Sequence, residues 1–177
     1  RTMGHENVQL MQGSLEHWKE AGGPVEEEPT TMLRAKDLDA SKPAQYTPRD
    51  PVDVVTMDDM LKFVEGNEAT IVDPRGSSFA KKGYMPGAKH LPYSSLVEPD
   101  NKLKLKSKEE LEKLFEEAGV DIHSEDPIVC SCGSGVSVCH VYLALEECGR
   151  EGKTVIYDGS WNEWSKNPHA PKVVPVK

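Results

Sequence analysis

Short apolar runs recur from about residue 52 to the end of the chain, separated by longer stretches of mixed polarity. Three runs have the length and the branched side chains of buried strands: "ATIVD", "PIVCS" and "TVIYDGS". "GYMPGAKHLP" has the composition of a turn followed by an extended segment, of the kind found at the edge of a sheet. The pattern therefore predicts a sheet with at least one short edge strand.

Apolar residues at helical spacing fill the segments between these runs. Thr56 precedes such a stripe and is followed by two aspartates, which predicts a capped helix start. Ser107 and Glu110 form a capping box for a second helix, which Gly119 ends. "GVSVCHVYLALEEC" predicts a third helix. Strand and helix in alternation predict an α/β domain with a mainly parallel central sheet flanked by helices.

The beginning of the chain resembles a segment near its end. "GHENVQLMQGSLEHW" and "GREGKTVIYDGSWNEW" share a Gly-Ser pair and a final tryptophan. Both predict a strand, a turn and a short helix anchored by that tryptophan, Trp18 in the first copy and Trp164 in the second. The strand of the first copy is predicted over residues 8–11. A tandem duplication accounts for the similarity, with the first copy represented only by its last strand and helix.

Three parts of the chain follow from this duplication. Residues 1–28 are predicted to be the carboxyl-terminal remnant of a first domain that is otherwise absent from the sequence. Residues 29–50 are predicted to be an interdomain linker, because their prolines oppose regular structure. Residues 51–177 then form the domain that carries the chemistry.

Composition limits the classes of function. The 177 residues are 37% hydrophobic, which fits one domain of ordinary size and the fragment of a second. The net charge of −9 disfavours a nucleic-acid partner, which requires a basic face. No apolar run reaches the roughly 18 residues that span a bilayer, and the first residues do not resemble a signal or transit peptide. Four cysteines predict a reducing, intracellular compartment rather than a disulfide scaffold.

Residues 130–140, "CSCGSGVSVCH", concentrate reactive side chains where a predicted strand gives way to a helix. A metal site needs ligands that converge, but Cys139 and His140 are adjacent on a helix and diverge by about 100°. The chain also has no C-x-x-C pair, so no metal is expected. Free cysteine often packs as a small apolar residue. This packing role is predicted for Cys130, Cys139 and Cys148.

Cys132 has a different setting. Five residues separate it from the apolar part of the helix: Gly133, Ser134, Gly135, Val136 and Ser137. Two glycines let the backbone curl so that successive N–H groups point inward, as an anion-binding nest at a helix amino terminus. A thiol at the mouth of such a nest has a lowered pKa and is a nucleophile. The two serine hydroxyls either add donors to the nest or cap the helix. A phosphatase would need an arginine at position 138, where this chain has Val138.

"CGSGVS", followed by "VCHVYLAL" and "YDGSWNEW", resembles the catalytic half of the rhodanese superfamily, and most of all its two-domain mercaptopyruvate/thiosulfate sulfurtransferases. "VDPR…GYMPGAKHLP" is similar to the D-x-R…GHIPGA-x-x-P signature of that family, with Tyr84 in place of its histidine. The resemblance implies a rhodanese-like fold for residues 51–177. It also implies that residues 1–28 are the end of a non-catalytic rhodanese-like domain, and it implies no cofactor.

The same resemblance implies a sulfurtransferase. Cys132 would take a sulfane sulfur from a small-molecule donor, 3-mercaptopyruvate or thiosulfate, and hold it as a persulfide. The sulfur would pass to cyanide or to a thiol acceptor such as thioredoxin or glutathione, while the N–H groups of residues 133–137 stabilise the anion. The neutral loop is similar to that of the mercaptopyruvate-preferring branch. Further implied are the missing amino-terminal half as a partner and a cytoplasmic or mitochondrial location, with no nucleic acid and no membrane involved.

Two departures from the family pattern concern the substrate. Relatives that bind mercaptopyruvate carry arginines in a longer insertion, where this chain has only "GSSFAKK". Arg75 is expected to be mainly structural and to pair with Asp73, and it remains a candidate for substrate binding. Lys81 and Lys82 either supply positive charge to the substrate or form a solvated face. The alternative function is a non-catalytic rhodanese-like binding or redox-sensing module. No catalytic role is predicted for His90, His123, His140 and His169.

Overall fold

The structure is a computed structural model of the chain. It describes Gly4 and residues 7–11, 13–28 and 53–174. The chain divides into two units, residues 1–51 and 52–177. The predicted linker, residues 29–50, lies outside the described residues.

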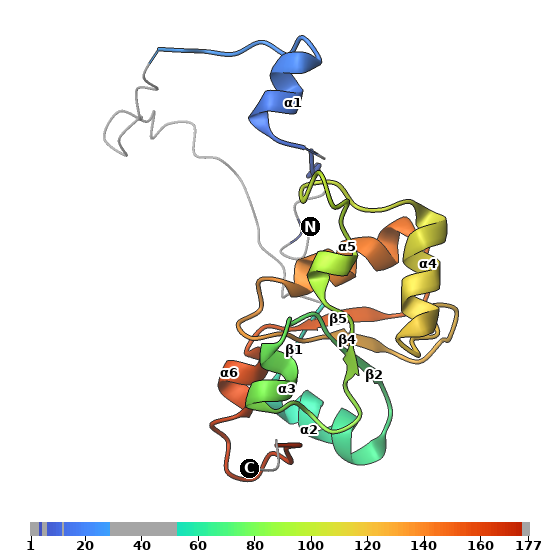
Figure 1. Cartoon of the computed structure of the whole chain (residues 1–177). Helices are drawn as coiled ribbons and strands as arrows, with labels where there is room; N and C mark the ends of the chain where they lie inside the picture. Colours follow the sequence, from blue (N-terminus) through green and yellow to red (C-terminus); the bar gives the residue numbers. More distant parts are fainter. Residues whose placement is uncertain (1–3, 5–6, 12, 29–52, 175–177) are drawn as a thin grey trace, which may run out of the picture. The chain divides into compact units, whose positions relative to one another are not determined.

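A five-stranded, all-parallel sheet forms the centre of the second unit (Figure 1). Its strands lie side by side in the order β1-β5-β4-β2-β3. They are β1 (Val54–Val55), β2 (Thr70–Asp73), β3 (Lys89–His90), β4 (Ile128–Cys130) and β5 (Thr154–Tyr157). The prediction of an α/β domain with a mainly parallel sheet is confirmed, and so is the short edge strand, β3.

Helices precede or follow each strand of this sheet. They are α2 (Met57–Gly66), α3 (Ser78–Lys82), the 3-10 helix η2 (Tyr93–Ser95), α4 (Lys108–Glu117), α5 (Val138–Glu147) and α6 (Ser160–Trp164). Both predicted caps are present: the Thr56 and Ser107 hydroxyls each accept a backbone N–H at 3.3 Å. The third helix begins at Val138 rather than at Gly135, because Gly135 has a φ of +80° that no helix accommodates. Among the described residues, no helix has the length and apolar character needed to cross a bilayer.

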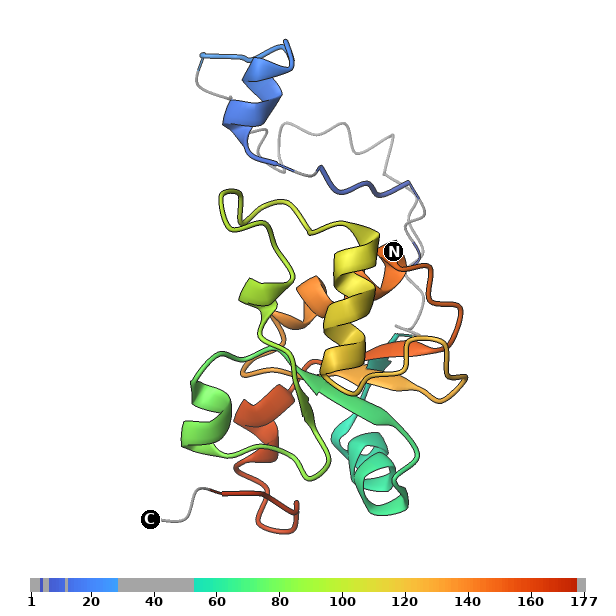
Figure 2. The same cartoon turned by 45° about the vertical axis from the view of Figure 1, so that its right-hand side comes forward.

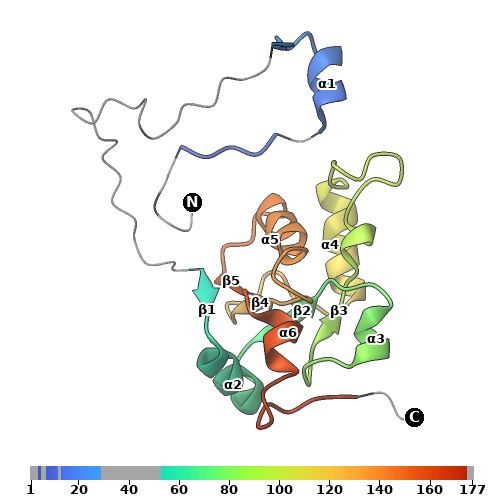
Figure 3. The same cartoon turned by 90° about the vertical axis from the view of Figure 1, so that its left-hand side faces the viewer.

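Two apolar cores fill the space between the sheet and its helices. α4 and α5 cover one face of the sheet, and α2 and α6 cover the other (Figures 2 and 3). Successive side chains of a strand point to opposite faces, so that Val72 enters the first core while Ile71 enters the second. Every strand with three or more residues is thus buried on both sides. This explains why the strands read as continuous apolar runs in the sequence.

The cysteines divide differently from the prediction. Cys130 and Cys148 are buried in the core under α4 and α5, as expected of packed thiols. Cys139 is exposed, so its predicted packing role is wrong. The buried stripe of α5 runs through Val138 and Val141, and the residue after Val138 lies about 100° further around the helix, on the solvent side. All four cysteines are free thiols.

The first unit contains one short helix, α1 (Leu15–Glu20), among its described residues. The predicted helix at Trp18 is therefore confirmed, but the strand over residues 8–11 is not formed. A strand needs a neighbour to satisfy its backbone groups, and no described segment pairs with these residues. The repeat nevertheless extends to one side-chain contact. The indole N–H of Trp18 donates to the carbonyl of Pro24 at 2.9 Å, and that of Trp164 donates to Pro171 at 2.8 Å.

Candidate active site

A pocket of about 450 Å³ lies at the carboxyl end of the parallel strands. The carboxyl ends of parallel strands share one edge of a sheet, so the segments that follow β2, β3 and β4 meet there. β4 leads to Cys132, and β2 leads to Arg75. The pocket is lined by Arg75, Ser78, Tyr93, Cys132, Gly133, Ser134, Val136, Ser137 and His140. The structure therefore brings Cys132 and most of its predicted loop into one cavity with Arg75.

The Cys132 thiol sits in a cradle of hydrogen-bond donors. Burial of the thiol raises its pKa. The hydroxyl of Ser137 and the backbone N–H groups of Ser134, Ser137 and Val138 lower the pKa by more than burial raises it, so the pKa of Cys132 falls below the ordinary value. The hydroxyl of Ser137 makes no capping bond to α5, which leaves it to the sulfur. The donors lie partly beyond the predicted residues 133–137, since the N–H of Val138 takes part. Val138, which stands where a phosphatase would need an arginine, thus contributes its backbone N–H to the cradle.

The two glycines of the loop have different roles. At Gly135 the backbone has a φ of +80°, and an added Cβ would lie 2.6 Å from a carboxylate oxygen of Asp158 and 2.8 Å from its carbonyl oxygen. Only glycine fits there without displacing the neighbouring strand end. At Gly133 an added Cβ would meet nothing closer than the Arg75 Cδ, at 3.9 Å. The curl of the loop therefore depends on Gly135.

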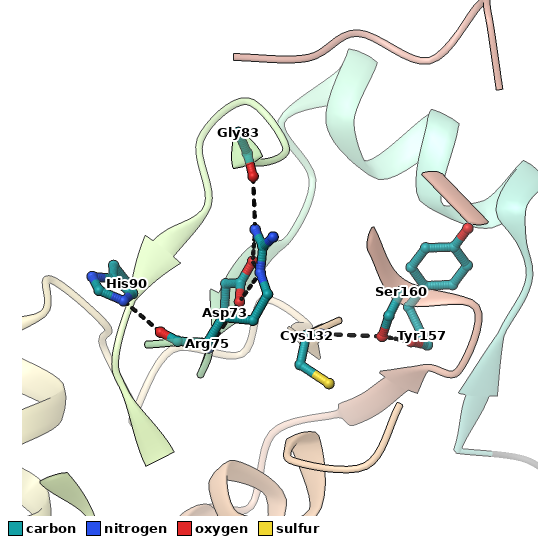
Figure 4. A network of polar contacts seen from close by, with 7 residues as sticks. All are labelled: Asp73, Arg75, Gly83, His90, Cys132, Tyr157 and Ser160. Carbon is teal, nitrogen blue, oxygen red and sulfur yellow. Dashed lines mark hydrogen bonds and ion pairs between the residues drawn. The ribbon is translucent and has the colours of Figure 1, made fainter. Parts of the chain in front are cut away.

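The turn between β5 and α6 contacts the start of the cysteine loop through Ser160 (Figure 4). The backbone N–H of Cys132 donates to Ser160 Oγ at 3.1 Å, and that hydroxyl donates to the Tyr157 carbonyl at 2.8 Å. In Figure 4 the dashed line from Ser160 ends at the backbone of Cys132 and not at its sulfur. The hydroxyl thus holds the backbone of the nucleophile and does not contact its sulfur.

Arg75 forms a buried ion pair with Asp73, as predicted. Their side chains are joined at 2.7 Å, and a second guanidinium N–H, on Nε, donates to the same carboxylate at 2.9 Å. Arg75 Nη2 also donates to the carbonyl of Gly83 at 2.9 Å (Figure 4). The guanidinium lies near the rings of Phe79 and Trp161. Breaking such a pair leaves an uncompensated buried charge, so Arg75 fixes the wall of the pocket more than it offers a free charge.

Lys81 and Lys82 lie elsewhere. Both side chains are exposed on the last turn of α3, and neither is among the residues that line the pocket. Of the two readings left open by the sequence, this placement favours a solvated face. Their predicted contact with the substrate remains a prediction without support from the geometry.

Tyr93 and His140 line the pocket although sequence reasoning gave them no role. Their rings lie 5.1 Å apart in a tilted arrangement. Position in the fold could have identified Tyr93, because it follows the edge strand at the same end of the sheet as Cys132. His90 has a supporting contact instead, with Nε2 lying 2.6 Å from the Arg75 carbonyl oxygen. Among the described residues, no three histidine, cysteine or acidic side chains are grouped to hold a metal ion.

Known proteins are similar to this chain in sequence and fold. Residues 56–167 match the family model described as a rhodanese-like domain. The chain is 31% identical to 3-mercaptopyruvate sulfurtransferase of Mus musculus, over 93% of this chain and 54% of that protein. It is 30% identical to thiosulfate sulfurtransferase of Gallus gallus, over 100% of this chain and 60% of that protein. The chain thus spans about half the length of the curated relatives that it matches.

Solved structures agree with the sequence comparison. The 3-mercaptopyruvate sulfotransferase SseA of Escherichia coli matches with a TM-score of 0.70 and 28% identity, over 90% of this chain and 58% of that one. The anaerobic ergothioneine biosynthesis enzyme of Chlorobium limicola matches with a TM-score of 0.78 over 99% of this chain and 43% of that one. Its 19% identity shows the shared fold alone. Together with the parallel sheet, the family match shows that the chain belongs to the rhodanese-like domain family.

Proposed function

We propose that this chain transfers a sulfane sulfur from 3-mercaptopyruvate, or less efficiently from thiosulfate, to cyanide or to a thiol acceptor such as thioredoxin or glutathione. The carrier is a persulfide on Cys132. One observation carries this proposal: Cys132 lines a pocket, and the Ser137 hydroxyl with the backbone N–H groups of Ser134, Ser137 and Val138 holds the pKa of its thiol below the ordinary value. Such a cradle stabilises a negative sulfur both before and after it gains a second sulfur atom.

The first step forms one bond and breaks one. The Cys132 thiolate attacks the sulfur of 3-mercaptopyruvate, the carbon–sulfur bond breaks, and its electron pair leaves on the pyruvate enolate. The proton of the donor thiol passes to the enolate carbon, so the products are pyruvate and an anionic persulfide. With thiosulfate, the sulfur–sulfur bond breaks and sulfite leaves.

The second step regenerates the thiolate. The acceptor thiolate or cyanide attacks the outer sulfur, and the electron pair of the broken sulfur–sulfur bond returns to Cys132. No external oxidant or reductant is required in either step. The hydrogen-bond donors of the loop stabilise the negative charge on sulfur in both steps, and this stabilisation lowers the barrier of each step.

Charge in the pocket favours the monoanionic donor. The loop residues are neutral, and the guanidinium of Arg75 is paired with Asp73. Thiosulfate is a dianion and gains more than 3-mercaptopyruvate from free cations near the sulfur. Lys81 and Lys82 would be such cations, but they are exposed outside the pocket. We therefore propose 3-mercaptopyruvate as the preferred donor.

Two measurements test this function. Exposure to 3-mercaptopyruvate without an acceptor should add the mass of one sulfur atom to the tryptic peptide that contains Cys132. In steady-state assays, 3-mercaptopyruvate should have a higher kcat/KM than thiosulfate. The double variant Lys81→Gln/Lys82→Gln should leave the preference unchanged. No gain of sulfur from either donor would favour the non-catalytic binding or redox-sensing module. A thiosulfate preference that the double variant abolishes would assign donor choice to the lysines.

The first unit supports a further part of the proposal, the partner. Apolar side chains of this unit are exposed, with Trp18 at 41% and Leu10 at 75%. Exposed apolar groups of this size mark a contact surface. The chain spans about half the length of its relatives, and we propose that this surface packs on a first rhodanese-like half. All four cysteines are free thiols, which supports the proposed cytoplasmic or mitochondrial location.

Native mass and limited proteolysis test this partner. The chain alone should be cut rapidly within residues 1–28, and a separately expressed first half of a two-domain relative should protect them and raise the native mass. The protection should disappear in Leu10→Asp/Trp18→Asp, because a charge at an apolar interface is costly. A native mass equal to the 19.6 kDa chain, with residues 1–28 already protected, would refute the proposal.

A further inference from the structure

The backbone of the nucleophile is held by a residue far along the chain. Ser160 is completely buried, and its hydroxyl joins two segments: it accepts the N–H of Cys132 at 3.1 Å and donates to the Tyr157 carbonyl at 2.8 Å. Figure 4 shows this path from the loop to the end of β5. Both functions of the hydroxyl are used, so its orientation is fixed.

The first turn of α6 holds the next two peptide groups. The N–H of Trp161 donates to the Cys132 carbonyl at 3.0 Å, and the N–H of Asn162 donates to the Gly133 carbonyl at 3.0 Å. In a trans peptide the C=O and the following N–H point in opposite directions. With both carbonyls directed at α6, the N–H groups of Gly133 and Ser134 are directed away from it.

This orientation decides the electrostatics of the loop. The N–H of Ser134, directed away from α6, is among the groups that lower the pKa of the Cys132 thiol. A rotated peptide plane would present a carbonyl oxygen to the sulfur in place of an N–H. The negative end of that dipole repels an anionic sulfur, so the loop binds anions only while its carbonyls stay on α6.

The backbone at Ser160 indicates that the hydroxyl matters. Its φ is +51°, a left-handed conformation that glycine adopts easily and serine does not. In the described residues only Asn67 shares this feature among non-glycine residues, and asparagine tolerates it at a helix end. A strained residue persists where the surrounding contacts over-determine it. At this position glycine would relieve the strain but would lose both hydrogen bonds.

We propose that Ser160 is a positioning residue: with the first N–H groups of α6, it holds the peptide planes that follow Cys132 in the orientation that binds anionic sulfur. The inference deepens the proposed sulfur transfer and rests on Cys132 as its nucleophile. Ser160 acts through the loop and does not touch the reacting atoms. The cradle is thereby set before a donor arrives, so that no reorganisation is needed during the reaction.

Alkylation of Cys132 by iodoacetamide, followed by mass spectrometry across a pH series, tests the inference without any sulfur donor. Cys139→Ser is the background, because Cys139 is the exposed thiol. Cys148 stays silent near neutral pH, since burial raises its pKa to about 11. Because the cradle favours the thiolate, the modification rate of Cys132 should rise through a midpoint below that of an ordinary thiol.

Two variants separate the hydroxyl from the backbone strain. Ser160→Ala and Ser160→Gly should both move the midpoint upward, by about one pH unit, as expected for loss of roughly one hydrogen bond to an anion. Their Tm values should differ, with Ser160→Gly the more stable because it relieves the φ. Val155→Ala is the matched control: Val155 is fully buried on β5, the strand that precedes Ser160, and its substitution should lower Tm without moving the midpoint.

An unchanged midpoint in both folded serine variants would overturn the inference, and so would an equal shift in Val155→Ala. If neither serine variant folds, hydrogen exchange of the wild-type protein decides. The amides of Cys132, Trp161 and Asn162 should then be protected, and free exchange of all three would refute the proposal. A midpoint that depends on Ser160 in a protein that transfers no sulfur would sink the proposed function while leaving this inference intact.

Discussion

Cys132→Ser is expected to abolish sulfur transfer, with kcat/KM falling by about 10⁴-fold or more. A serine hydroxyl is not ionised near neutral pH, and oxygen cannot replace sulfur as the carrier of a persulfide. The donors that now stabilise the thiolate would instead surround a neutral hydroxyl. Steady-state assays with 3-mercaptopyruvate and cyanide measure the loss. Mass spectrometry of the donor-treated variant should show no added sulfur.

The other cysteines provide matched controls for this prediction. Cys139→Ser changes an exposed side chain and should leave both activity and stability near those of the wild type. Cys130→Ser places a hydroxyl in the core and should lower the free energy of unfolding by about 1–3 kcal/mol, with kcat retained in the folded protein. Equal loss of activity in all three variants would contradict the assignment of Cys132 as the single nucleophile. It would point to joint action of the thiols, as in a metal site.

Gly135→Ala is expected to disable the cradle. The left-handed backbone alone costs an alanine about 1–2 kcal/mol of stability. The added methyl group would also lie 2.8 Å from the carbonyl oxygen of Asp158, so the loop must move. Displacement of the N–H donors from the sulfur should lower kcat by about 10²-fold, the usual effect of losing a donor to a developing anion. The Cys132 alkylation midpoint should rise in the same variant.

Gly133→Ala tests whether the effect belongs to the conformation or to any added methyl group in the loop. Gly133 is not among the glycines with a positive φ. A Cβ added at Gly133 would make only an ordinary van der Waals contact. The variant should therefore retain most of its activity and its Tm. If Gly133→Ala and Gly135→Ala were equally active, the curl at Gly135 would not govern the cradle.

Local signals explain what the sequence predicted well. Ser107 and Glu110 form their capping box within one turn, so neighbouring residues determine it. The apolar runs of β2, β4 and β5 predicted a buried parallel sheet because both of their faces are covered. Cys132 was identified from two glycines and a following helix, all within a few residues.

Contacts between distant segments explain what the sequence did not reveal. Ser160 follows β5 and contacts the backbone of Cys132, which follows the neighbouring strand β4. The two residues are far apart in the sequence, and no local pattern links them. The exposure of Cys139 depends on where α5 begins, and helix boundaries shift by a residue or two with the cap. The strand over residues 8–11 fails for a related reason. Its predicted form needs a neighbouring strand, and none is found among the described residues.

The register of β1 has a consequence for how the domain is made. Val54, at the start of the sheet, pairs with Ile156 in β5, the last strand to be synthesised, so the edge of the sheet stays open until β5 has emerged. Ser160 and α6 follow β5 in the sequence. The backbone of Cys132 therefore gains its support only when nearly all of the domain has left the ribosome. If Ser160 positions the loop as proposed, the nascent chain is expected to carry Cys132 without this support until α6 has formed.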